Sequence, residues 1–111
     1  MTAPPGAGAV IVAYHPEPSQ LTALIAALGG QVERIVIVNN GPAATLTISR
    51  DSKTMVIQAE TNLGVGAAIN RGVADLIDHD LGHALLLDQD STIGPDLVLT
   101  LTTHLERERQ K

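Results

Sequence analysis

The chain has 111 residues, 44% of them hydrophobic, and a formal net charge of −5 at pH 7. It contains one tyrosine but no phenylalanine or tryptophan, so aromatic stacking on nucleobases is nearly absent, and together with the acidic balance this excludes a typical nucleic-acid binder. It has no cysteine, which excludes disulfides, thiolate metal sites and cysteine catalysis.

Length and hydropathy favour a single domain with an aliphatic core. No apolar run approaches the roughly 18 residues of a membrane-spanning helix, and the N-terminus lacks the basic start of a secretion signal. We therefore expect a cytoplasmic protein, and a peripheral position at the inner membrane stays open. Residues 1–8 are rich in proline and glycine and are predicted to be a poorly ordered leader to a domain over 9–111.

Four short apolar runs predict buried strands over residues 9–14, 34–38, 55–59 and 84–87, because they are continuous rather than alternating. Helical periodicity predicts a helix from Pro18 or Ser19 to Leu28, a second over 65–77 and a last one from Leu97. Residues 43–53 are compatible with a short edge strand or an irregular loop. The order of elements predicts an α/β fold: a Rossmann-like three-layer sandwich around a mostly parallel four-stranded sheet.

Polar residues follow each predicted strand, and the carboxyl ends of parallel strands meet at one edge of the sheet. We therefore expect Tyr14, Asn39, Asn62 and the Asp88-Gln89-Asp90 segment to gather there. For Asn39 and Asn40, which precede a glycine, simple turn chemistry is an equal alternative. Among the small residues of the second helix, Ala68 and Gly72 fit tight packing on the sheet better than ligand contact.

Asp88 and Asp90 are two residues apart, so in an extended strand they lie on the same side. One can bind a divalent cation such as Mg²⁺ or Mn²⁺ while the other accepts a hydroxyl; the alternative is a polar turn that happens to contain two aspartates. Asp78, His79 and Asp80 are predicted to be solvated turn residues at the opposite end of the sheet.

Three segments together are similar to family 2 glycosyltransferases, which have the GT-A fold, and most of all to their rhamnosyltransferase branch. They are Val10-Ile11-Val12-Ala13-Tyr14-His15-Pro16, Asn62-Leu63-Gly64 with Asn70-Arg71-Gly72, and Leu85-Leu86-Leu87-Asp88-Gln89-Asp90-Ser91. The resemblance covers most of residues 9–98 and implies a truncated GT-A fold that binds a dTDP- or UDP-sugar, in polysaccharide biosynthesis, for transfer to a glycan acceptor. It implies substrate-binding roles for Ala13, Tyr14, Asn39, Asn62, Gly64, Asp88, Gln89 and Asp90.

By the same resemblance Asp90 is the metal ligand and Asp88 holds a ribose or sugar hydroxyl. The chain departs from the family pattern twice. Asn39 stands where an aspartate usually contacts the base, and Ile69 stands where many members have an arginine, so no arginine contact to phosphate is transferred.

In inverting members of the family, the carboxylate that deprotonates the acceptor lies downstream of the D-x-D segment, and no residue of this chain is assigned that role. The sequence therefore predicts a donor-binding domain that is inactive alone and whose exposed apolar surface promotes homo-oligomer formation. Two alternatives stay open: a non-catalytic interaction module with the same fold, and, as the weakest, a nucleotidyltransferase, for which the first strand lacks a following glycine-rich basic loop.

Overall fold

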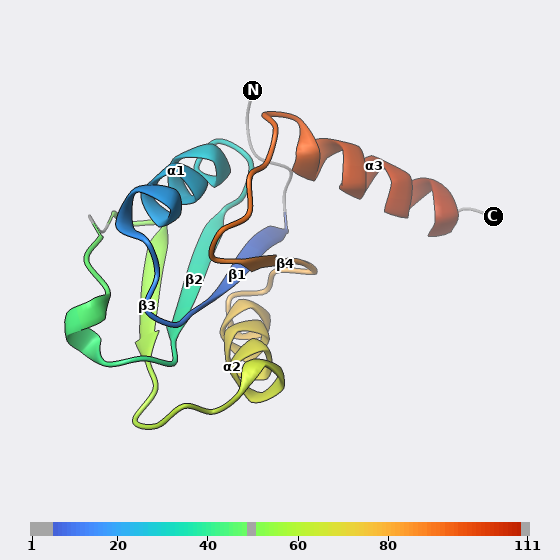
Figure 1. Cartoon of the computed structure of the whole chain (residues 1–111). Coiled ribbons are helices and arrows are strands. Elements are labelled where there is room, and N and C mark those ends of the chain that lie inside the picture. Colours follow the sequence, from blue (N-terminus) through green and yellow to red (C-terminus); the bar gives the residue numbers. More distant parts are fainter. Residues whose placement is uncertain (1–5, 49–50, 110–111) are drawn as a thin grey trace.

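The computed structural model describes residues 6–48 and 51–109. Four parallel strands form one sheet in the order β3-β2-β1-β4 (Figure 1). The strands are β1 (Ala7–Ala13), β2 (Arg34–Asn39), β3 (Thr54–Gln58) and β4 (His83–Asp88). The helices are α1 (Pro18–Leu28), α2 (Val65–Asp78) and α3 (Leu97–Arg109), with a short 3₁₀ helix, η1 (Ala43–Thr45), between β2 and β3.

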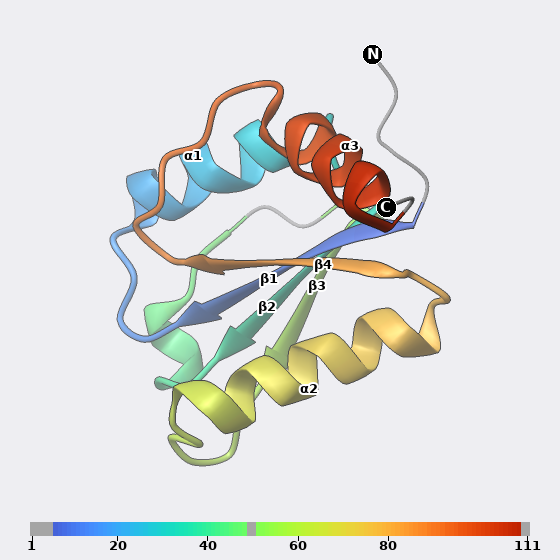
Figure 2. The ribbon, with the colours of Figure 1, turned by 90° about the vertical axis from the view of Figure 1, so that its right-hand side faces the viewer.

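The expected three layers are present. Figure 2 shows α1 and α3 on one face of the sheet and α2 on the other. The connection through α1 leads from β1 to β2 while the connection through α2 returns from β3 to β4, so right-handed crossovers place the two helices on opposite faces. Within β1, Ala9 and Ile11 pack toward α1, and Val10 packs toward α2. This coverage on both faces explains the continuous apolar run.

Strand β1 begins at Ala7, so the last two residues of the predicted leader belong to the sheet. Ala7 is only 2% exposed, and its carbonyl accepts a hydrogen bond from Glu33 N–H at 2.9 Å. Gly8 permits this start, because a Cβ there would lie 2.6 Å from Cδ2 of Leu76 on α2. Residues 1–5, which carry the rest of that prediction, lie outside the described part of the chain.

The segment between β2 and β3 is irregular rather than an edge strand over its described residues. Pro42 precedes η1, and its carbonyl accepts a hydrogen bond from the Thr45 hydroxyl at 2.6 Å. Before β3, the Asp51 carboxylate accepts hydrogen bonds from the backbone N–H groups of Lys53 and Thr54, both at 2.9 Å. Side-chain capping of this kind replaces the ladder bonds of a strand.

Two helices begin in different ways. The carboxylate of Glu17 caps α1 by accepting from Ser19 N–H and Gln20 N–H, and the hydrogen bond from the Ser19 hydroxyl, with these two, holds the pKa of Glu17 below its usual value. Helix α2 begins after Gly64, whose φ of +77° suits glycine. On α2, Ala68 is fully buried, and Gly72 lies so close to Val10 that any Cβ would overlap it, which confirms the predicted packing role.

Within residues 6–48 and 51–109, no helix combines the length and apolar character needed to cross a membrane.

Candidate functional site

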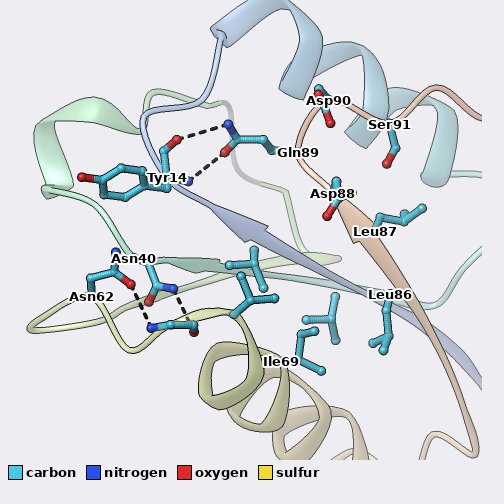
Figure 3. A pocket seen from close by; sticks show the side chains of 14 residues that line it. Tyr14, Asn40, Asn62, Ile69, Leu86, Leu87, Asp88, Gln89, Asp90 and Ser91 are labelled. Atoms are coloured by element: carbon cyan, nitrogen blue, oxygen red, sulfur yellow. Dashed lines mark hydrogen bonds between the residues drawn. The ribbon is translucent and has the colours of Figure 1, made fainter.

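A pocket of about 680 Å³ opens at the carboxyl edge of the sheet, between the ends of β1 and β4 and the start of α2 (Figure 3). The chain leaves β1 for β2 on one side of β1, whereas it later crosses back from β3 to β4 on the other side of β1. The pocket therefore lies at the topological switch point at which open α/β sheets bind ligands. Its lining residues are Val10, Val12, Tyr14, Asn40, Asn62, Gly64, Val65, Ile69, Leu86, Leu87, Asp88, Gln89, Asp90 and Ser91.

Most of the residues assigned to the site from the sequence meet in this pocket. Tyr14 comes from the end of β1, Asn62 and Gly64 from the loop before α2, and Asp88, Gln89 and Asp90 from the end of β4. Two assigned residues, Ala13 and Asn39, are fully buried and do not line it. The structure thus brings together six of the eight assigned positions, drawn from three strand ends.

Asn39 is bound into the turn after β2. Its amide nitrogen donates to Gln58 Oε1 at 2.9 Å and to the Pro42 carbonyl at 3.4 Å, and its oxygen accepts from Gly41 N–H at 3.1 Å. With its side chain fully buried and satisfied, Asn39 performs the turn chemistry that the sequence left as an alternative.

Asn40 lines the pocket in place of Asn39. It was not among the residues assigned to the site from the sequence. Its amide nitrogen donates to the Gly64 carbonyl at 3.2 Å, and its oxygen accepts from Leu63 N–H at 3.3 Å. One carboxamide therefore holds the loop before α2 against the end of β2 (Figure 3). Asn62 tightens the same loop by accepting from Gly64 N–H at 2.8 Å. The available signal was the alternation of side chains along β2, which places residue 40 on the opposite side from residue 39.

The loop after β4 is attached to β1 by Gln89. Its side-chain oxygen accepts from Tyr14 N–H at 2.7 Å, and its nitrogen donates to the Tyr14 carbonyl at 3.1 Å (Figure 3). The Tyr14 side chain is 53% exposed at the pocket rim. Its ring meets the ring of His15 edge to face, with centroids 4.5 Å apart.

Asp88 and Asp90 are the acidic residues among the described lining of the pocket. Asp88 is the last residue of β4 and Asp90 lies in the turn that follows, so the prediction that both lie on one side of an extended strand is wrong. Both are exposed, and within the described residues neither carboxylate has a hydrogen-bond or ion-pair partner. Within residues 6–48 and 51–109, no group of three or more acidic or histidine side chains is placed to hold a metal ion. With both carboxylates free, one can coordinate a Mg²⁺ or Mn²⁺ ion, which would take its remaining oxygens from water and from a bound phosphate, while the other can accept a hydroxyl.

Among the residues that the structure describes, no lysine or arginine lines the pocket. Ile69 lines it, and Arg71, two residues further along α2, is exposed and lies outside it. The first turn of α2 has no side-chain cap, so its backbone N–H groups add a weak positive field. A diphosphate placed in this pocket would depend on a cation for most of its charge compensation.

Asp78, His79 and Asp80 lie at the end of α2, before the amino end of β4, and all three are exposed. This confirms the prediction that they are solvated and remote from the site; His79 and Asp80 lie in a turn, whereas Asp78 is the last residue of α2.

Comparison with known proteins gives two matches. Residues 9–111 match the sequence model of the family described as glycosyl transferase family 2. The chain is 31% identical over 105 residues to dTDP-rhamnosyl transferase RfbF of Shigella flexneri, and the aligned region covers 93% of this chain and 36% of that protein. The chain thus spans just over a third of the length of this relative. No solved structure matches significantly.

Proposed function

The chain belongs to glycosyl transferase family 2, and on this premise we propose that it is the donor-binding part of a rhamnosyltransferase-like enzyme. Its ligand is a pyrimidine nucleotide-diphospho-sugar such as dTDP-rhamnose, with UDP-sugars as the next class. The observation that supports this most is the meeting of Tyr14, Asn62 and the Asp88–Asp90 segment around one pocket at the switch point. The relative RfbF, named as a dTDP-rhamnosyl transferase, supports the choice of nucleotide.

Each residue has a role that follows from its chemistry. Asp90 binds the divalent cation, and Asp88 accepts a hydrogen bond from a ribose or sugar hydroxyl. Tyr14 offers the face of its ring to the base at the rim. Asn40 and Asn62 hold the loop before α2 so that the N–H groups of its first turn face the diphosphate. When bound, the cation would stabilise the charge that develops on the leaving diphosphate.

We expect these 111 residues to bind the donor without transferring its sugar. Deprotonation of a glycan acceptor needs a carboxylate base beside the acceptor site, and we assign that role to none of the residues around the pocket. In this proposal the acceptor site belongs to other parts of the enzyme.

The proposal is tested by titration calorimetry with dTDP and UDP, with and without Mn²⁺, on the native chain and on Asp90→Asn. We expect Mn²⁺ alone to bind weakly, since Asp90 is its one assigned protein ligand. We expect dTDP to bind with Mn²⁺ but at least about tenfold more weakly without it or in Asp90→Asn. Asp80→Asn is the matched control, because Asp80 is exposed at the opposite end of the sheet and its φ of +61° suits asparagine.

Tight dTDP binding that survives both removal of the metal and Asp90→Asn would refute the assigned site. Absence of any nucleotide binding, with no effect of chelators, would instead favour the non-catalytic interaction module.

A further inference from the structure

We propose that Gln89 is a positioning residue of the donor site rather than a ligand of the donor. Its carboxamide holds the backbone of Tyr14, and by doing so it fixes Asp88 and Asp90, its neighbours on either side, at the edge of the pocket. This inference rests on the proposed donor-binding function and assigns one residue of that site a role different from the one the sequence suggested.

The geometry shows what the side chain replaces. Backbone pairing between β1 and β4 ends at Val12 and Asp88, because the chain then turns, with Ser91 N–H donating to the Asp88 carbonyl at 3.1 Å. Tyr14 would otherwise have no β4 neighbour for its backbone groups. Gln89 takes up both of them, accepting at 2.7 Å and donating at 3.1 Å. The side chain thus acts as one more residue of the missing strand.

A primary carboxamide suits this role because it carries a donor and an acceptor side by side, as a peptide unit does. Both of its polar atoms are engaged by Tyr14. The two flanking carboxylates are exposed and have no partner of their own within the described residues, and like charges this close in sequence repel each other. The Gln89 side chain is therefore the anchor that lies between the two acids, whereas Gln31 holds the same loop further along by donating to the Gly94 carbonyl at 2.9 Å.

The test compares Gln89→Met, which keeps the length of the side chain but removes both hydrogen bonds, with Gln89→Glu. The glutamate still accepts from Tyr14 N–H but sets a carboxylate oxygen against the Tyr14 carbonyl. Thr103→Met is the control, since Thr103 is exposed on α3, does not line the pocket, and its hydroxyl has no partner among the described residues. Two quantities are measured: affinity for dTDP with Mn²⁺ by calorimetry, and the hydrogen-exchange rate of the Tyr14 amide by NMR.

We expect both Gln89 variants to bind dTDP with Mn²⁺ about tenfold more weakly than the native chain, and Gln89→Met to speed exchange at Tyr14. Thr103→Met should change neither quantity. Gln89→Glu is the sharper variant. An added negative charge would strengthen cation binding if residue 89 were a ligand, whereas loss of the hydrogen bond to the Tyr14 carbonyl weakens cation binding if residue 89 only positions the loop.

Three results would overturn the inference. Native affinity in Gln89→Met, at any exchange rate of Tyr14, refutes a positioning role. Tighter binding in Gln89→Glu means that residue 89 contacts the cation or the donor directly. If the native chain binds no nucleotide with Mn²⁺ while its Tyr14 amide is protected from exchange, the hydrogen bonds between Gln89 and Tyr14 exist but the proposed donor site is refuted. The positioning role of Gln89 is then refuted with it.

Discussion

Side chains around the pocket divide by chemistry. The carboxamides of Asn40, Asn62 and Gln89 are engaged in hydrogen bonds to the protein itself, whereas the carboxylates of Asp88 and Asp90 have no partner within the described residues. Amides are neutral and carry both donors and acceptors, so they can satisfy backbone groups without a large desolvation cost. This leaves the acids free for a cation.

The sequence could predict which residue types lie at the pocket but not all of their tasks. The strand ends follow from periodicity, and they led to five of the residues that line the pocket; the sixth, Gly64, was implied by the family resemblance. Whether position 39 or 40 faces the ligand depends on where β2 ends and how the following turn closes. The hydrogen bonds that decide this, to Gln58 and Gly64, come from segments distant in the sequence.

Asn39→Asp tests the site at the residue scale, since it restores the aspartate that the resemblance leads one to expect there. We expect this change to lower the free energy of unfolding by about 1–3 kcal/mol without tightening dTDP binding. Its carboxylate would be buried against the Pro42 carbonyl and Gln58 Oε1, which now accept from the Asn39 amide. Urea denaturation and calorimetry measure the two effects.

A flip of the Gln58 amide would not remove the cost of Asn39→Asp. If its amide flipped to donate to the new carboxylate, the Gly41 carbonyl would lose the hydrogen bond that it now accepts from Gln58 Nε2 at 2.8 Å. Tighter dTDP binding in Asn39→Asp, with stability unchanged, would show that residue 39 contacts the base and that our placement of it is wrong.

At the scale of elements, the strands and helices were predictable because each apolar pattern has one period over its whole length. The exceptions are boundaries that tertiary contacts decide and the burial of β4, which was predicted to be a buried strand but whose residues alternate between half-buried and exposed, with Leu86 49% exposed. β1 reaches back to Ala7 because Gly8 fits beneath Leu76, and a pairwise fit of this kind has no local signature. The irregular path before β3 is set by capping from Thr45 and Asp51, which competes with strand pairing in a way that composition alone does not resolve.

Gly72→Ala tests the packing of α2 on β1. We expect a net loss of about 1 kcal/mol in the free energy of unfolding, because overpacking costs about 1–3 kcal/mol while alanine gains roughly 1 kcal/mol in helix propensity. The cause is overlap between the new methyl group and the Val10 side chain, which is β-branched and only 1% exposed. In a Val10→Ala background, which removes the obstructing methyl groups, the same change should become neutral or stabilising.

Gly66→Ala on the same helix is the matched control. A Cβ at Gly66 would meet no atom within 4 Å, so this change should stabilise by up to about 1 kcal/mol through helix propensity alone. Equal effects of Gly72→Ala in the native and Val10→Ala backgrounds, measured by chemical denaturation, would show that this contact does not limit helix–sheet packing.

At the scale of the whole molecule, β4 lies at one edge of the sheet, and the last helix, α3, extends away from the body of the domain (Figure 1). Leu86 on β4 and Leu99, Leu101 and Leu105 on α3 are each at least 40% exposed. Unpaired edges and exposed leucines promote association, so homo-oligomer formation stays a prediction. The strand order itself could not be read from the sequence, because all the strands are apolar and none is marked as an edge.

The central claim is that a nucleotide and a divalent cation bind at the carboxyl edge of the sheet, at Asp90. The chain contains its own alternative, the acidic segment Asp78–Asp80 at the opposite end. Paramagnetic broadening of backbone amide resonances by Mn²⁺ in the presence of dTDP distinguishes the two ends directly. We predict that the resonances of Asp88–Ser91, Tyr14 and Asn62 broaden first, while those of Asp78–Asp80 persist. Broadening centred on Asp78–Asp80, or spread evenly over both acidic segments, would contradict the assignment.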